Sequence, residues 1–130
     1  MKKDINPTKV EDIGIAIVKE TNELNQEEWN AYFLNLKNEE IECVIVRSNG
    51  YSEDKTTTEL RRLLNTIPAQ SAVKFEPLQP EIFELTNQFW VSFVLDNELQ
   101  DKKFVFVPGS VDEKNFVDIP ILGVEGVLIV

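Results

Sequence analysis

Carboxylates are the side chains of this chain that could carry chemistry. The 130 residues include 23 Asp and Glu, a single Cys and no His. Hydrolytic sites of the Ser-His-Asp and Cys-His types need an imidazole as general base, and structural zinc sites draw their ligands from His and Cys. The chemistry that remains open is that of carboxylates, which bind calcium or act in pairs on a glycosidic bond.

Acidic residues group at two places in the sequence. They are Asp96, Glu98 and Asp101 in an expected hairpin loop, and Asp112, Glu113 and Asp118 near the C-terminal strands. Calcium takes roughly six to eight oxygen ligands, and the EF-hand loop places a glycine and a distal glutamate at fixed positions. Neither group has that spacing. We interpret both as solvated turns and predict no metal site.

The inventory of small and sulfur-bearing residues leaves few other routes to catalysis. The five glycines, Gly14, Gly50, Gly109, Gly123 and Gly126, fit neither GxxxxGK[ST] nor GxGxxG, so nucleotide-phosphate loops are excluded. The lone Cys43 lies in the apolar run 41–46, where we expect a buried, unreactive thiol. We therefore predict no cofactor and no enzymatic activity.

Four aromatic residues keep a second class of function open. A glycosidase with paired carboxylates, or a domain that binds carbohydrate or another small ligand, needs a cleft lined by aromatic side chains. Trp29, Tyr32, Tyr51 and Trp90 are the candidates for such a lining. The alternation along the chain places most aromatic residues in the core, so this function is the alternative.

The charge balance restricts the partners. With 13 basic and 23 acidic residues, the net charge is −10, which repels the phosphates of nucleic acids and anionic membrane surfaces. Such a charge serves solubility or, as the alternative, favours a basic protein partner. No apolar run approaches the roughly 20 residues of a membrane helix, and residues 1–7 lack the apolar stretch of a signal peptide. We predict a soluble protein of the cytoplasm. An unpaired cysteine also fits this reducing compartment.

Short alternating segments indicate a mainly β protein. Strands are expected at residues 12–19, 29–36, 41–48, 72–77, 89–95, 102–107, 116–122 and 126–130, and a helical turn at 80–85. Spacing predicts hairpins over 29–48 and 89–107. In the segment 12–19, one face is large and apolar and the other small and apolar, which favours a strand covered on both sides. The pattern predicts one domain, 1–130, with a frayed end at 1–9, folded as an antiparallel β-sandwich, immunoglobulin-like by analogy, or a barrel.

In one segment the apolar residues recur with the period of a helix and not with that of a strand. Leu60, Leu63, Leu64 and Ile67 recur at the spacing of a helical face, and Pro68 ends the segment. We predict a short helix over residues 58–67, with an irregular edge strand as the alternative because threonines precede it.

The predicted helix would present basic side chains together. Lys55, Arg61 and Arg62 would form an island of positive charge on an acidic surface, and we predict them as contacts to a partner. The function expected from the residues is a non-catalytic domain that binds a protein partner or forms a homodimer.

Five segments together give the chain a family likeness. They are residues 29–36, 48–51, 89–93, 102–108 and 116–120. The chain resembles a set of small bacterial proteins of unknown function that are sometimes labelled phenylalanyl-tRNA synthetase subunit. The three arginines, Arg47, Arg61 and Arg62, are too few to form the ATP-binding sheet of a synthetase. The resemblance therefore implies an unknown function and no site residues.

Overall fold

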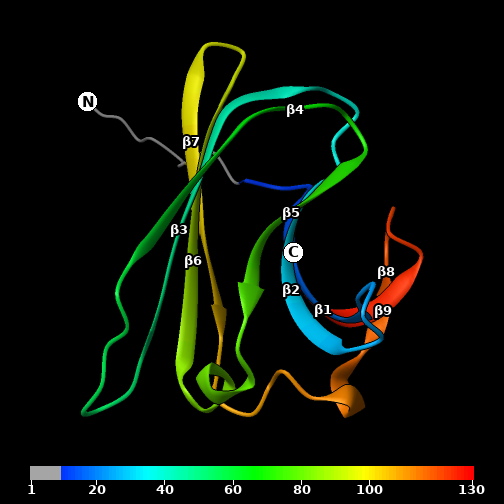
Figure 1. Ribbon diagram of the computed structural model, residues 1–130. Helices are drawn as coiled ribbons and strands as arrows, with labels where there is room; N and C mark the ends of the chain where they lie inside the picture. Colours follow the sequence, from blue (N-terminus) through cyan, green and yellow to red (C-terminus); the bar gives the residue numbers. More distant parts are fainter. Residues whose placement is uncertain (1–9) are drawn as a thin grey trace.

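The computed structural model describes residues 10–130, and these residues form two antiparallel sheets packed face to face (Figure 1). The predicted frayed end, 1–9, lies outside the described residues. The strands are β1 (Ile13–Thr21), β2 (Glu27–Asn35), β3 (Ile41–Tyr51), β4 (Leu60–Ile67), β5 (Ser71–Leu78), β6 (Thr86–Leu95), β7 (Glu98–Phe106), β8 (Val117–Ile119) and β9 (Val124–Ile129). Two short 3-10 helices, η1 (Pro80–Glu84) and η2 (Glu113–Asn115), complete the described part. The predicted β-sandwich is confirmed, and the sheets do not close into a barrel.

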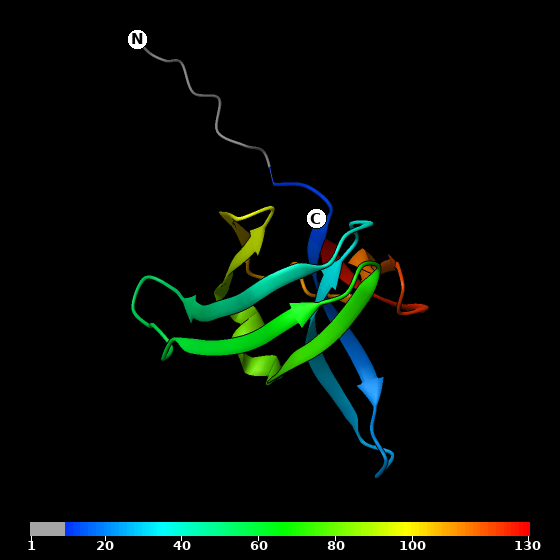
Figure 2. The same cartoon turned by 90° about the horizontal axis from the view of Figure 1, so that it is seen from above.

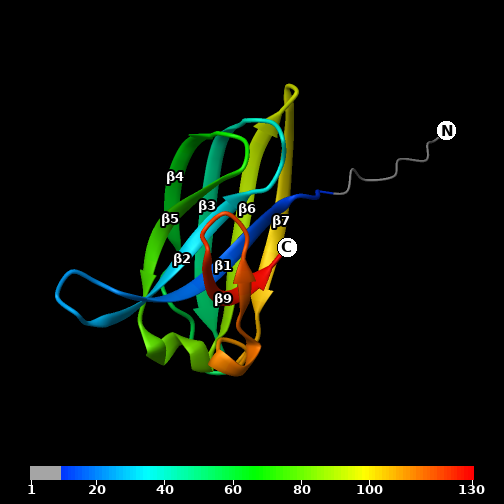
Figure 3. The ribbon, with the colours of Figure 1, turned by 90° about the vertical axis from the view of Figure 1, so that its right-hand side faces the viewer.

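The chain passes repeatedly from one sheet to the other. The five-stranded sheet has the order β5-β2-β1-β9-β8, and the four-stranded sheet has the order β4-β3-β6-β7. Figure 3 shows the strands of the two sheets running at an angle to each other, as expected for packed, twisted sheets. Hairpins join β1 to β2, β3 to β4, β6 to β7 and β8 to β9 within one sheet. The other connections cross between sheets.

The predicted hairpin over residues 29–48 is wrong for this reason. β2 pairs with β1 and β5, whereas β3 pairs with β4 and β6, so the turn at 37–40 crosses between the sheets. The Asn35 side chain, 0% exposed, fixes this crossing. Its amide nitrogen donates to the backbone oxygens of Glu39 (2.9 Å) and Pro68 (2.9 Å), and its oxygen accepts from the backbone nitrogen of Lys37 (3.1 Å). One side chain thus ties the crossing after β2 to the crossing after β4.

The main core lies between the sheets and is rich in phenylalanine. Phe33, Phe89, Phe93, Phe104 and Phe106 are all fully buried. Phe89 meets Phe75 and Phe106 edge-to-face, with ring centroids 6.0 Å and 5.7 Å apart. Because Phe75 belongs to the five-stranded sheet and the other two to the four-stranded sheet, these rings connect the layers.

A second, smaller core covers the outer face of β1 and β2. Ala16, Val18 and Leu34 are fully buried there beneath Ile119, the last residue of β8, and Leu122, which follows β8. The prediction that the segment 12–19 is covered on both faces is confirmed. Gly126 permits the close approach of β9 to β1, because a Cβ atom at this position would lie 2.6 Å from the backbone oxygen of Ile17.

A bulge in β3 overturns the prediction for Cys43. Strict alternation from Ile41 would bury the thiol, but Cys43 has a φ of 54° and is exposed. The register between β3 and its neighbours shifts between Ile41 and Val44, so both of these side chains point inward with an extra residue between them.

The predicted helix over 58–67 is also wrong, and its edge-strand alternative is correct. β4 pairs with β3 along the edge of the four-stranded sheet. Leu64 and Ile67 contact the core, although they are three residues apart, because Asn65 between them has a φ of 62° and interrupts the alternation. A strand with such an interruption places apolar residues at the same spacing as a helical face does. A helix as short as this segment has little stability of its own.

The ends of the sandwich are closed differently. η1 and η2 lie at the same end (Figures 1 and 3), where Trp29 meets Phe83 and Phe116 edge-to-face. The β1–β2 hairpin projects beyond the body of the sandwich (Figure 2).

The predicted turn at 80–85 and the predicted hairpin over 89–107 are confirmed, although this hairpin turns tightly at Asp96 and Asn97. No helix among residues 10–130 has the length and apolar character needed to span a bilayer.

Candidate functional site

The outer face of the four-stranded sheet carries a row of basic and aromatic side chains. Arg61 on β4 lies opposite Arg47 on β3, Arg47 lies opposite Trp90 on β6, and Trp90 lies opposite Lys103 on β7. These side chains point outward because their neighbours along each strand, such as Phe89, Val91 and Phe104, are buried in the core. We call Arg61, Arg47, Trp90 and Lys103 the cationic row.

Trp90 is the centre of the cationic row. The guanidinium carbon of Arg47 lies 5.3 Å from its ring centroid, and the ammonium nitrogen of Lys103 lies 5.4 Å from it. The cations come from the strands on either side, and attraction to the π-system holds each of them over the half-buried indole. The row is therefore an ordered surface in which charge and aromatic area lie side by side.

Within the described part of the chain, the cations of the cationic row form no close ion pair, although Asp101 lies two residues from Lys103 on the same face of β7. Among residues 10–130, no carboxylate lies within 4.0 Å of the cationic nitrogens of Arg47, Arg61 or Lys103. Arg47 and Arg61 stand directly opposite each other, a placement of like charges that destabilises a sheet. The arrangement thus costs stability in the free protein and leaves three exposed cations available to an anion.

The predicted partner contacts Lys55, Arg61 and Arg62 do not share one surface. Arg61 belongs to the cationic row, whereas Arg62 lies opposite the buried Val46 and points to the inner side of the sheet. Lys55 is exposed in the loop between β3 and β4. Their contact with a partner stays a prediction. The structure groups Arg61 with the other residues of the cationic row and not with Lys55 and Arg62.

Sequence reasoning missed most of the cationic row. Arg47, Trp90 and Lys103 are far apart in the chain, and only the pairing of β3, β6 and β7 brings them into register. The signal that could have found them is the tryptophan on the outward face of the segment 89–95, because a large aromatic side chain away from the core is worth explaining.

A pocket of about 280 Å³ opens between the two sheets near the start of β4 and the end of β5. Ser48, Leu60, Glu76, Leu78 and Phe89 are among the residues that line it. Glu76 is 6% exposed, and its Oε1 accepts a hydrogen bond of 2.8 Å from the Ser48 hydroxyl. Burial raises the pKa of Glu76, while the hydrogen bond from Ser48 and the charge of Arg62 act in the opposite direction.

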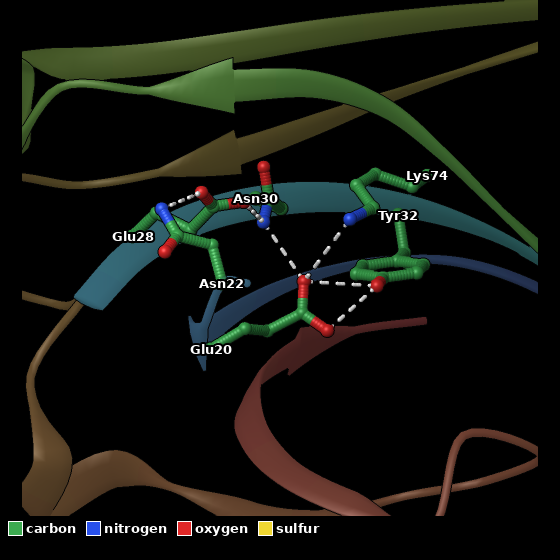
Figure 4. Close-up of polar contacts among 6 residues, drawn as sticks. All are labelled: Glu20, Asn22, Glu28, Asn30, Tyr32 and Lys74. Atoms are coloured by element: carbon green, nitrogen blue, oxygen red, sulfur yellow. Dashed lines mark hydrogen bonds and ion pairs between the residues drawn. The ribbon is translucent and has the colours of Figure 1, made fainter. Parts of the chain in front are cut away.

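A polar cluster lies on the outer face of the five-stranded sheet (Figure 4). The Tyr32 hydroxyl contacts both carboxylate oxygens of Glu20, at 2.9 Å and 2.8 Å. The Asn30 amide donates to Glu20 (2.8 Å) and to Glu28 (2.8 Å), and Lys74 lies 3.7 Å from Glu20. These contacts join two carboxylates, a phenol, an amide and an ammonium group in one polar network.

Tyr32 keeps its phenolic proton within this cluster. Burial and the neighbouring Glu20 carboxylate raise the pKa of Tyr32 from 10.0 to about 12, so the phenol keeps its proton at neutral pH. A phenol that is protonated more readily in the folded than in the unfolded chain stabilises the fold below pH 10, and this stabilisation is lost as the pH rises towards 12.

The variant Tyr32→Phe tests this linkage. We expect the free energy of unfolding of the wild type to fall more steeply than that of Tyr32→Phe as the pH rises from 10 to 12. Urea unfolding at a series of pH values measures both slopes. Tyr51→Phe, which removes an exposed phenol from β3, is the control and should retain the wild-type slope. Equal slopes for wild type and Tyr32→Phe would contradict the assignment.

Two acidic residues, Glu27 and Glu28, line a hollow beside Trp29, but their carboxylates do not face each other. Glu27 forms an ion pair with Lys19 (3.5 Å), which lies over the Trp29 ring. Glu28 points to the other face of β2, where it accepts hydrogen bonds from Asn22 (3.0 Å) and Asn30. A glycosidase needs two carboxyl groups that flank one bond, and this hollow does not offer that arrangement.

The four aromatic residues considered for a cleft also lie apart. Trp90 is on the outer face of the four-stranded sheet, and Tyr32 is on the outer face of the five-stranded sheet. Trp29 lies at the end closed by η1 and η2, and Tyr51 is exposed at the end of β3. The acidic groups expected in turns are separated as well. Glu98 and Asp101 belong to β7, and Asp112 caps η2. Within the range 10–130, no three acidic or cysteine side chains are placed to hold a metal ion.

No family model matches the chain, and neither a curated protein nor a solved structure is significantly similar to it. The resemblance to small bacterial proteins therefore stays a prediction from the sequence, and the functional argument depends on the site geometry alone.

Proposed function

We propose that this chain is a non-catalytic binding domain that docks an acidic, extended segment of a protein partner on the cationic row. The observation that supports this proposal is the row itself: Arg47 and Lys103 are held over Trp90, and Arg61 extends the row to the sheet edge. Tryptophan and arginine are the residue types that dominate the energetics of protein interfaces. Carboxylates of a partner would neutralise the row and relieve the repulsion between Arg47 and Arg61.

An acidic protein segment fits this surface better than a nucleic acid does. The net charge of −10 repels a long polyanion wherever it extends beyond the row. A short segment with a few carboxylates meets only the local positive charge, because other charges are screened beyond roughly 8 Å at physiological salt. The edge strand β4 lies beside the row and has unpaired backbone groups on its outer side, to which an extended segment can add as a further strand. We place this interaction in the cytoplasm, where the exposed thiol of Cys43 stays reduced.

The double variant Arg47→Glu/Lys103→Glu tests the proposal. Oligo-glutamate peptide is the probe, titrated at low salt while the fluorescence of the tryptophans is recorded. We expect the wild type to bind it and the double variant to bind at least tenfold more weakly, since reversing two contacts of roughly 0.7 kcal/mol or more each gives about that factor. Arg61→Glu alone should weaken binding by a smaller factor.

The matched control is Lys37→Glu/Lys114→Glu, which makes the same change in net charge away from the cationic row. It should bind oligo-glutamate nearly as the wild type does. Equal losses in both double variants, or no binding by the wild type, would contradict the proposal. Lys55→Glu tests whether this predicted contact also belongs to the surface, and a loss similar to that of Arg61→Glu would add Lys55 to it.

A second copy of this acidic chain is the alternative source of the carboxylates. Sedimentation of the wild type over a range of concentrations separates the two cases. If the wild type is a dimer and Arg47→Glu/Lys103→Glu is a monomer, the partner is another copy of the chain. If the wild type is a monomer at all concentrations, the partner is a different acidic protein.

A further inference from the structure

We propose that the pocket between β3 and β5 binds a small primary amine with an apolar body, with Glu76 as the anchor of the ammonium group. The pocket lies on the inner side of the four-stranded sheet, whereas the cationic row lies on its outer side, so this site is separate from the proposed docking surface. The two sites also require ligands of opposite charge.

Glu76 has an unused acceptor in this pocket. The Ser48 hydroxyl donates to Oε1, but among residues 10–130 no hydrogen bond and no ion pair reaches Oε2. The side chain as a whole is 6% exposed, and Oε2 is not among the fully enclosed atoms that lack a partner, so this oxygen keeps contact with solvent at the pocket. A donor from a ligand would take the place of that solvent. The hydrogen bond from Ser48 holds the other carboxyl oxygen in place.

The lining specifies the remainder of the ligand. Leu60, Pro77, Leu78 and Ile82 give the pocket an apolar wall, and its volume of about 280 Å³ suits a small molecule. A ligand with a hydrocarbon body and one cationic donor matches this wall and the single carboxyl group. A sugar suits it less, because the aromatic ring in the lining, Phe89, is 1% exposed and occupied by packing in the core.

Arg62 limits the affinity of this site in the free protein. It lies on the inner side of β4, two positions from Leu60, and its charge acts on Glu76 without an ion pair within 4.0 Å. A bound ammonium group would share the carboxylate with this guanidinium and be repelled by it. Removing the charge of Arg62 should therefore strengthen the binding of an amine, an effect opposite to that of removing Glu76.

Titrations followed by ¹⁵N–¹H correlation spectra test the site. The probes are phenethylamine, the neutral 2-phenylethanol and the anionic 3-phenylpropionate, which share one apolar body. We expect phenethylamine to shift the amide signals of Ser48, Glu76 and Leu78, and to bind about tenfold more tightly than the alcohol, since a charge-assisted hydrogen bond is lost with the alcohol. The anion should not bind.

Two variants decide whether Glu76 is the anchor. Glu76→Gln keeps the shape and should reduce the preference for the amine over the alcohol to less than twofold, and Arg62→Gln should tighten the binding of the amine two- to threefold. Equal affinities for amine and alcohol in the wild type, an unchanged preference in Glu76→Gln, or no shifts with any probe would overturn the proposal. Arg47→Glu/Lys103→Glu should leave the amine titration unchanged, so failure at one site is distinguishable from failure at the other.

Discussion

Replacement of Phe89 by alanine is expected to lower the free energy of unfolding by about 3–5 kcal/mol. Phe89 is 1% exposed and lies between Phe75 of the five-stranded sheet and Phe106 of its own sheet. Truncation removes a large buried apolar surface and leaves a cavity that the two sheets cannot close without moving. It also removes two edge-to-face contacts, which are worth roughly 0.5–1.5 kcal/mol each.

Urea unfolding followed by circular dichroism measures this loss. Phe89→Leu is the matched control, because leucine fills most of the same space and loses mainly the ring contacts. We expect Phe89→Leu to cost about 1–2 kcal/mol. Similar values for the two variants would show that the neighbouring side chains collapse into the space, and that the rings do not connect the two sheets as described.

Asn35→Ala is expected to cost about 2–4 kcal/mol of unfolding free energy. The amide of this fully buried side chain donates to Glu39, Pro68 and Ile67 and accepts from Lys37. Alanine would leave these backbone groups without that partner at the place where two connections cross between the sheets. Unsatisfied groups at such a position cost more than the net value of the hydrogen bonds that are lost.

Asn38→Ala serves as the control for this variant. Asn38 is exposed in the same connection, and among residues 10–130 its amide oxygen accepts only a long contact of 3.5 Å from Gln70. We expect this replacement to change the unfolding free energy by less than about 0.5 kcal/mol. Hydrogen exchange adds a local measurement, since Asn35→Ala should increase exchange at the amides of residues 37 and 70, whereas Asn38→Ala should not. Equal effects on stability would contradict the role given to Asn35.

The two proposed sites place opposite demands on electrostatics in one small domain. The cationic row gathers three of the 13 basic residues on one outer face, and the pocket buries one of the 23 acidic residues between the layers. Arg61 and Arg62 are adjacent in the chain and serve different sides of the sheet, because successive side chains of a strand point to opposite faces. Variants of these neighbours should therefore separate the two activities.

Alternation along the segments 12–19 and 89–95 determined much of the fold in advance. It identified β1 as covered on both faces and placed Phe89 and Trp90 on opposite faces of β6, because the two-residue period of a strand is a local property of the backbone. It failed where the backbone leaves this period. The positive φ angles of Cys43 and Asn65 shift the register of β3 and β4, and no residue type in those segments requires them.

The sequence by itself determined that the chain is mainly antiparallel β-structure, that histidine-dependent chemistry is excluded, and that the molecule is strongly acidic, whereas the structure decided for a sandwich over a barrel. These properties follow from composition and from local periodicity. Only the tertiary structure decided which strands are neighbours, and with them the cationic row, which needs Arg47, Trp90 and Lys103 in register, and the pocket, which needs Ser48 opposite Glu76. The physical reason is that strand pairing and sheet packing join residues far apart in the chain, and their energies depend on contacts that no local pattern contains.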